Sequence, residues 1–108
     1  MSVIKLNIYK KDNKKEIEKT LTADGYELML GTVEDFMNVI DIEKVGNSTE
    51  VAKMVVKGYS QIKPLLKDIF PELTDEDFKC VKVNDLVRTI IQLGTAVVES
   101  LDTLKTGN

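Results

Sequence analysis

The stretch EVAKMVVKGYSQIKPLLKDIF, residues 50–70, decides how the rest of the chain can fold. At 100° per residue, its apolar residues fall on one side of a helix. The central stripe of that side consists of Val51, Val55, Gly58, Ile62, Leu66 and Ile69, and Met54 and Leu65 flank it on one edge. The apolar arc spans about 200°, whereas a surface helix needs only about 100°. Such a helix must be covered from two directions, by a small bundle or also by another molecule.

A proline, Pro64, lies inside this pattern, where it removes one N–H donor and crowds the carbonyl of Ser60. The apolar period continues beyond it, so we expect one helix that kinks at Pro64. We place the end of this helix at Phe70, because Pro71 follows. At its start, Ser48 or Thr49 is expected to cap the first turn.

The composition describes one ordinary globular domain. Hydrophobic residues make up 43% of the 108 residues and charged residues 31%, so we expect a single domain over residues 1–108. The formal net charge of −3 disfavours a nucleic-acid partner. The one dense basic run, Lys10, Lys11, Lys14 and Lys15, is assigned to a solvated turn.

The cysteine count and the hydropathy pattern bear on the compartment. Cys80 is the single cysteine, which excludes an internal disulfide and fits a reducing compartment. No run approaches the about 20 apolar residues that a membrane helix needs, and the N-terminus lacks the core of a signal peptide. We therefore expect a cytoplasmic protein with no membrane partner.

The first 24 residues predict a β-hairpin. Residues 2–9 alternate, with Ile4, Leu6 and Ile8 on one side, and residues 16–23 alternate with Ile17, Leu21 and Ala23 on one side. The turn pair Asp12-Asn13 lies between them. Two strands alone are marginal in water. The hairpin must therefore rest on the helices or join a sheet from another copy.

Residues 32–104 predict about four helices, which makes the fold α+β and mostly α. The first helix is expected to begin at Thr32, with Asp35 completing a capping box, and to end near Glu43. A short helix is capped by Thr74 and reaches about Cys80. The last helix is capped by Asn84, ends near residue 104 and leaves a frayed tail at 105–108.

The last helix carries two adjacent apolar stripes. The first consists of Leu86, Ile90, Leu93, Val97, Leu101 and Leu104, and the second of Val87, Ile91, Gly94 and Val98. Their combined arc of about 160° exceeds what one neighbouring helix covers. Candidate partner-binding residues are those expected to remain exposed once a core forms. They are Met54, Leu65, Val87, Ile91 and Val98; the alternative is that all five are core.

The sequence offers no catalytic constellation. Histidine is absent, which removes the commonest general base and the commonest metal ligand. There is neither a phosphate-binding glycine loop nor a cysteine pair for zinc. The adjacent acids Asp75, Glu76 and Asp77 point in different directions on a helix, so we assign them to the cap rather than to a metal. We expect no catalytic, cofactor or metal site, and therefore not an enzyme.

Three stretches carry a family resemblance: IKLNIYKKDNKKEIEKTLTADGYELMLG at 4–31, GTVEDFMNVIDIEKV at 31–45, and KMVVKGYSQIKPLLKDIFPELTDEDFKCVKVNDL at 53–86. Together they resemble the tail assembly chaperones of long-tailed bacteriophages and prophages of Gram-positive bacteria. The resemblance implies a non-catalytic protein that coats the tape measure protein during virion morphogenesis. It also implies that the chain helps to recruit tail tube subunits, self-associates modestly, and is the short form of a pair made by ribosomal frameshifting.

Two other classes of protein remain open. One is a small adaptor or regulatory protein whose helices bind a single host or phage protein. The other is a DNA-binding regulator built on the helices between Thr74 and Leu104. The only cations of the last helix are Arg88 and Lys105, which disfavours a groove-reading helix. An enzyme is conceivable only if an oligomer completes its site.

Overall fold

The computed structural model describes residues 3–105, apart from the side chains of Tyr26 and of residues 103–105. Two strands come first, β1 (Val3–Tyr9) and β2 (Ile17–Asp24). The helices are α1 (Leu30–Val39), α2 (Ser48–Lys57), α3 (Tyr59–Ile69), α4 (Asp75–Phe78) and α5 (Val83–Lys105), with short 3-10 turns η1 (Gly25–Glu27) and η2 (Ile42–Lys44). The predicted class, a hairpin followed by a small helical bundle, is confirmed.

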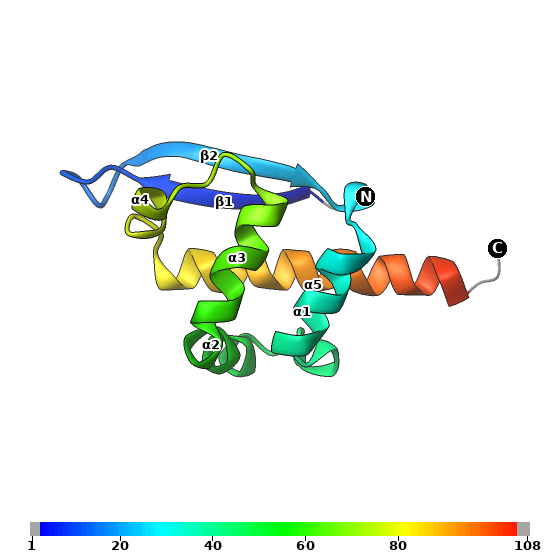
Figure 1. Ribbon diagram of the computed structural model, residues 1–108. Coiled ribbons are helices and arrows are strands. Elements are labelled where there is room, and N and C mark those ends of the chain that lie inside the picture. The colour runs from blue at the N-terminus through cyan, green and yellow to red at the C-terminus, as the bar shows by residue number, and fades with distance from the viewer. Residues whose placement is uncertain (1–2, 106–108) are drawn as a thin grey trace.

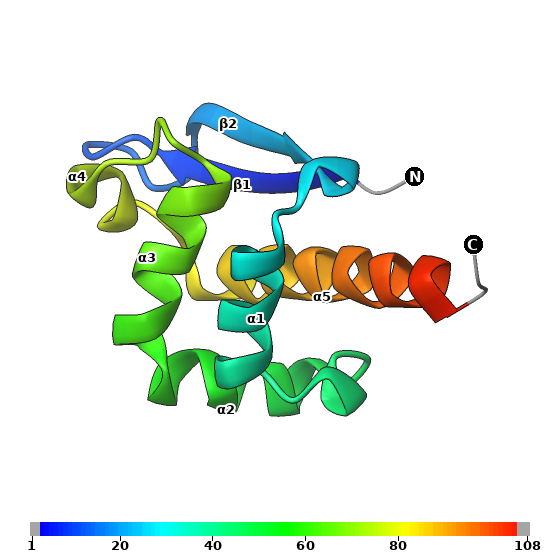
Figure 2. The ribbon, with the colours of Figure 1, turned by 45° about the vertical axis from the view of Figure 1, so that its right-hand side comes forward.

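The elements form three successive levels, and two helices run between the levels (Figures 1 and 2). The antiparallel hairpin is the first level, α5 the second and α2 the third, and β1 lies between β2 and α5. Helices α1 and α3 lie side by side across α5. Of the two ways to cover the hairpin, the chain uses its own helices for the inner face.

The core lies between the inner face of the hairpin and the crossing helices. Ile4, Leu6 and Ile8 of β1 are buried, as the two-residue alternation predicted. The first stripe of α5 is buried from its start through Val97, and Phe36 of α1 is fully enclosed. The core also holds Val51 and Val55 of α2 and Ile62 and Leu66 of α3.

A β-bulge determines which side of the hairpin Ile17, the first residue of β2, lies on. The register pairs Ile8 with Lys19 but Tyr9 with Ile17, so Glu18 is an extra residue on β2. Ile17 therefore shares a side with Tyr9 instead of with Leu21, and it is 45% exposed. The prediction that Ile17 faces inward with Leu21 is wrong for this reason.

The central helix breaks at Gly58, not at Pro64. Gly58 is both the last cap of α2 and the first cap of α3, whereas Pro64 lies within α3. A Cβ at Gly58 would lie 2.7 Å from Cγ1 of Val39, so only glycine lets the corner approach the end of α1. The apolar residues of 50–70 belong to two helices with different axes, and the single kinked helix is wrong.

The helix caps confirm one prediction and correct three. Thr74 caps α4 in a full capping box with Asp77. Thr32 lies inside α1, which starts at Leu30 without a side-chain cap and ends at Val39, before Glu43. The cap of α2 is Asn47, whose Oδ1 accepts from the N–H of Thr49 and Glu50. Sequence reasoning placed it one or two residues late.

The last helix begins at Val83, one residue before the predicted cap Asn84, and includes Lys105. The rest of the predicted frayed tail, residues 106–108, lies outside the described residues. Within residues 3–105, none of the helices combines the length and the apolar character that crossing a membrane requires.

Candidate protein-binding groove

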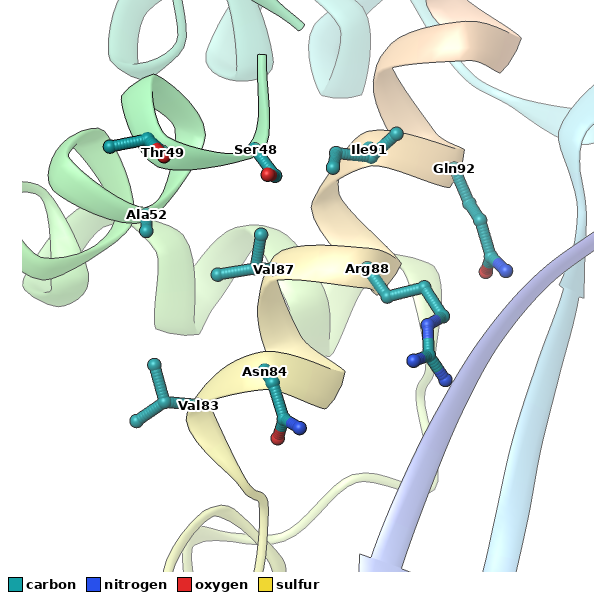
Figure 3. Close-up of a pocket in the computed structure, with 9 residues that line it drawn as sticks. All are labelled: Ser48, Thr49, Ala52, Val83, Asn84, Val87, Arg88, Ile91 and Gln92. Carbon is teal, nitrogen blue, oxygen red and sulfur yellow. The ribbon is translucent and has the colours of Figure 1, made fainter. Parts of the chain in front are cut away.

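An open groove of about 740 Å³ runs between the start of α2 and the first half of α5 (Figure 3). We call it the α2–α5 groove. Its lining residues are Ser48, Thr49, Ala52, Val83, Asn84, Val87, Arg88, Ile91 and Gln92. A volume of this size is typical of sites that bind ligands or short segments of other molecules.

The floor of the groove is apolar because of a four-residue spacing on α5. Val83, Val87 and Ile91 recur every fourth position, so they form one line along the helix. In Figure 3 their side chains point to the side of α2, where Ala52 lies. Val83 is 65% exposed, Ile91 is half-buried and Val87 is nearly buried. The line is therefore most exposed at Val83, enters the core at Val87 and is partly exposed again at Ile91.

The other end of the same stripe is closed by close packing. A Cβ at Gly94 would lie 2.8 Å from Cγ1 of Val45 and 3.3 Å from Cζ of Phe36. The glycine lets η2 and α1 approach α5 there. Val45 thus covers the stripe at Gly94, while the stretch from Val83 to Ile91 stays accessible. The groove is the part of the second stripe that the chain leaves partly uncovered.

Polar side chains form the rim of the groove. Arg88 is exposed, and its Nη1 lies 3.7 Å from Oδ1 of Asp85. Gln92 is already engaged, because its Oε1 accepts a 2.8 Å hydrogen bond from the N–H of Lys5. Ser48 and Thr49 supply hydroxyls at the first turn of α2. An apolar floor with a polar rim is the usual anatomy of a protein-binding surface.

The five candidate residues from the sequence are distributed over different surroundings. Val87 and Ile91 lie together in the groove. Met54 is half-buried, and its sulfur accepts from the N–H of Asp41 instead of facing the groove. Val98 is half-buried further along α5, beyond the groove. A binding role for each of them stays a prediction.

The expectation that Leu65 remains at the surface is wrong. Leu65 is 1% exposed and belongs to the core. Sequence reasoning placed it beside Met54 on one helical edge, but the change of axis at Gly58 puts the two residues on different helices. Val87, 8% exposed, also lies mostly within the core, so it offers a partner only one edge.

Among the apolar lining residues, Val83 and Ala52 were missed. Val83 was left outside the last helix because Asn84 was predicted as its cap, although the spacing of Val83 from Val87 and Ile91 matches a helical line. That spacing was the available signal. Ala52 gave none, because its place in the groove depends on how α2 packs against α5.

The acidic residues at the start of α4 form ion pairs with lysines of α3 and of the hairpin turn. Lys67 and Lys63 lower the pKa of Asp75, and a hydrogen bond from Lys11 lowers the pKa of Glu76. Among the described residues, no group of three or more His, Cys, Asp and Glu side chains could hold a metal ion. These carboxylates tie α4 to α3 and to the hairpin.

Comparison with family models, curated proteins and solved structures finds no match to this chain. The groove is therefore interpreted from its own geometry and chemistry.

Proposed function

We propose that this chain is a phage tail assembly chaperone whose α2–α5 groove binds helical segments of the tape measure protein. It acts without catalysis in the cytoplasm of the bacterial host during virion morphogenesis, and it helps to recruit tail tube subunits around the coated client. The client is the one that the resemblance of the sequence implies, and the groove supports the proposal as a surface of the right kind.

The observation that carries the proposal is the apolar line at the start of α5, which the chain leaves exposed at Val83 and partly exposed at Ile91. Val83 is 65% exposed beside Ala52 and Val87, in a hollow that opens to solvent. An amphipathic helix that lays its apolar face into such a groove buries residues at spacings of three and four. Full burial of one valine contributes about 1.5–3 kcal/mol, so one groove holds a client helix weakly.

Weak binding at each site suits a long client. A filament offers many similar helical segments, and copies that also contact one another bind it with high avidity. Each single contact can still break when the tail tube subunits replace the chaperone. Modest affinity per groove is consistent with a chaperone that is released during assembly and is absent from the finished tail.

Co-expression with the tape measure protein of the same phage tests the proposal. The wild-type chain should keep the tape measure protein soluble and co-purify with it. The double variant Ala52→Glu and Val83→Ser should lose both effects, because it places a charge on the α2 wall of the groove and removes the exposed apolar contact on its floor. Val56→Ser is the matched control, since Val56 is an equally exposed helical valine that does not line the groove.

Each result has a definite meaning. A wild-type chain that neither solubilises nor binds the tape measure protein contradicts the proposed function. A double variant that binds as well as the wild type contradicts the assignment of the client to this groove. The variants must first show wild-type melting and circular dichroism, which the exposure of Val83 leads us to expect.

A further inference from the structure

The basic run of the hairpin turn meets a second group of lysines in the fold. Figures 1 and 2 both show α4 beside the turn of the hairpin, and the chain runs from α4 directly into α5. Between these elements lies a hollow of about 300 Å³ that Tyr9, Cys80 and Val81 line together with five lysines. We call it the lysine hollow. Its lysines are Lys10, Lys11 and Lys14 from the turn, and Lys79 and Lys82 from the segment before α5.

Two carboxylates beside the lysine hollow pair with three of its lysines. Glu16 lies 2.8 Å from Nζ of Lys10. Glu76 lies 2.8 Å from Nζ of Lys11 and 3.4 Å from Nζ of Lys79, so one carboxylate serves two lysines. None of the residues that line the hollow is an Asp or Glu. These ion pairs therefore balance only part of the positive charge of the hollow.

Lys14 and Lys82 have no carboxylate partner among the described residues. Nζ of Lys82 lies 4.1 Å from the centre of the Tyr9 ring, and this cation–π contact holds the ammonium at the hollow without neutralising it. Asp85, which accepts from the Tyr9 hydroxyl, is also paired with Arg88. The N–H donors of two ammonium groups are therefore available to a ligand.

The chemistry of the lining indicates which ligand fits. Ammonium groups donate hydrogen bonds and cannot accept them, so the ligand must be an anion that is rich in acceptors. Phosphate groups combine several acceptor oxygens with more than one negative charge, and lysine is a common phosphate ligand. A volume of about 300 Å³ is at the lower end of the range for small-molecule sites.

The surroundings favour a small anion over a long one. The adjoining hollow, which shares Lys11 and Cys80 with the lysine hollow, is also lined by the exposed Asp12 and Glu18. A nucleic acid or an acidic peptide that extends past the lysine hollow would meet these carboxylates. An anion that fits inside the hollow meets only the lysines of its lining.

We propose that the lysine hollow binds a small polyphosphate, either free or as the phosphate chain of a nucleotide. Lys14 and Lys82 supply the ammonium groups that no carboxylate balances, and the bound anion joins the hairpin turn to the segment before α5. The hollow shares no lining residue with the α2–α5 groove. The inference does not rest on the proposed function.

Neutralising two of the lysines tests the binding. Lys14→Gln with Lys79→Gln should raise the dissociation constant for inorganic pyrophosphate, measured by calorimetry, about tenfold or more, because two charge-assisted contacts are lost. Lys53→Gln with Lys57→Gln is the matched control. It removes the same charge from exposed positions of α2, and Lys53 forms an i,i+3 ion pair as Lys79 does. The control should bind pyrophosphate like the wild type.

The single cysteine gives an independent readout, because Cys80 lines the hollow and is partly buried. A positive field concentrates anionic reagents. Cys80 should therefore favour iodoacetate over neutral iodoacetamide more strongly than the thiol of a Cys80→Ser, Thr22→Cys chain, which is exposed on β2 away from the turn. Pyrophosphate should slow the alkylation of Cys80 more than sodium chloride of equal ionic strength, and it should not protect Thr22→Cys.

Other anions decide the class of ligand. Equal affinity for pyrophosphate and ADP assigns the hollow to a free polyphosphate, whereas tighter binding of ADP assigns it to a nucleotide. An oligoglutamate peptide or a short DNA duplex that binds more tightly than pyrophosphate overturns the proposal. A wild-type chain that does not bind pyrophosphate overturns it as well, and so do equal effects of the two double lysine variants.

Discussion

The hydroxyl of Tyr9 donates a 2.6 Å hydrogen bond to Oδ2 of Asp85, 76 positions away in the sequence. Tyr9 is the last residue of β1. Asp85 lies in the first turn of α5 and is only 7% exposed. The pair fastens the hairpin to the helix that forms one wall of the groove. Lys82 lies over the Tyr9 ring, with Nζ 4.1 Å from the ring centre, and adds a cation–π contact to the same joint.

Removing this hydroxyl should destabilise the fold. Tyr9→Phe leaves the buried Asp85 carboxylate without its short hydrogen bond, which typically costs about 1–3 kcal/mol of the free energy of unfolding. Urea denaturation measures the loss. Tyr59→Phe should stay within about 0.5 kcal/mol of the wild type, because Tyr59 is exposed and its ring packs edge-on against Phe78. Equal effects of the two changes would contradict the role of the Tyr9–Asp85 pair.

The same pair makes the ionisation of Tyr9 a reporter of the hairpin joint. The hydrogen bond to Asp85, then burial and the charge of Asp85, raise the pKa of Tyr9 above the ordinary 10.0. Because this pKa is raised in the folded state, the Tyr9–Asp85 hydrogen bond contributes its full stabilisation of the fold below the pKa of tyrosine in the unfolded chain. This stabilisation is lost as the pH rises through the folded pKa. Ultraviolet titration of the wild type minus Tyr9→Phe should show a tyrosine that ionises above pH 10. An ordinary pKa would contradict the geometry.

The capping box of α4 should respond to acid. Burial opposes ionisation of Asp77, but hydrogen bonds from Thr74 and Lys19 outweigh it and lower its pKa. The cap therefore stabilises the fold above the unfolded pKa and loses its effect as pH falls through the folded one. Asp77→Ala removes the carboxylate that accepts from the N–H of Thr74 and should cost about 1 kcal/mol at neutral pH. The difference in stability between the variant and the wild type, measured by thermal melting, should become smaller in acid. A difference that does not change with pH would contradict the role of the capping box.

Two glycines inside helices should respond to alanine with opposite signs. Nothing lies within 4 Å of a Cβ at Gly31, so Gly31→Ala should gain about 0.5–1 kcal/mol from helix propensity. At Gly94 the new methyl would meet Val45 at 2.8 Å, and overpacking of this kind costs about 1–3 kcal/mol. Denaturation midpoints of the two variants measure this. Stabilisation by Gly94→Ala would mean that η2 does not pack against α5 as described.

Local periodicity predicted the parts of the fold that one element determines by itself. The inward face of β1 followed from its alternation, and the buried stripe of α5 followed from a pattern that continues through one helix. The break at Gly58 could not be found in this way, because the apolar period runs through it without interruption. A 3.6-residue apolar period does not show where the helix axis changes direction. For this reason sequence reasoning placed Leu65 at the surface.

Half of the groove was accessible to sequence reasoning. Val87 and Ile91 stood out because α5 carries more apolar surface than one neighbour covers. The wall contributed by Ala52 depends on the packing of α2 against α5, elements separated by α3 and α4. Similarly, the bulge that turns Ile17 outward comes from the register between strands, which alternation within one strand does not contain.

Methyl NMR tests the central claim, that the α2–α5 groove holds the helical client, most directly. A helical segment of the tape measure protein is titrated into the chain with labelled Ala, Val and Ile methyl groups. Shift changes should concentrate at Ala52, Val83, Val87 and Ile91, while Val56, exposed on α2 outside the groove, should not move. A client that binds while these four residues stay unperturbed would contradict the account.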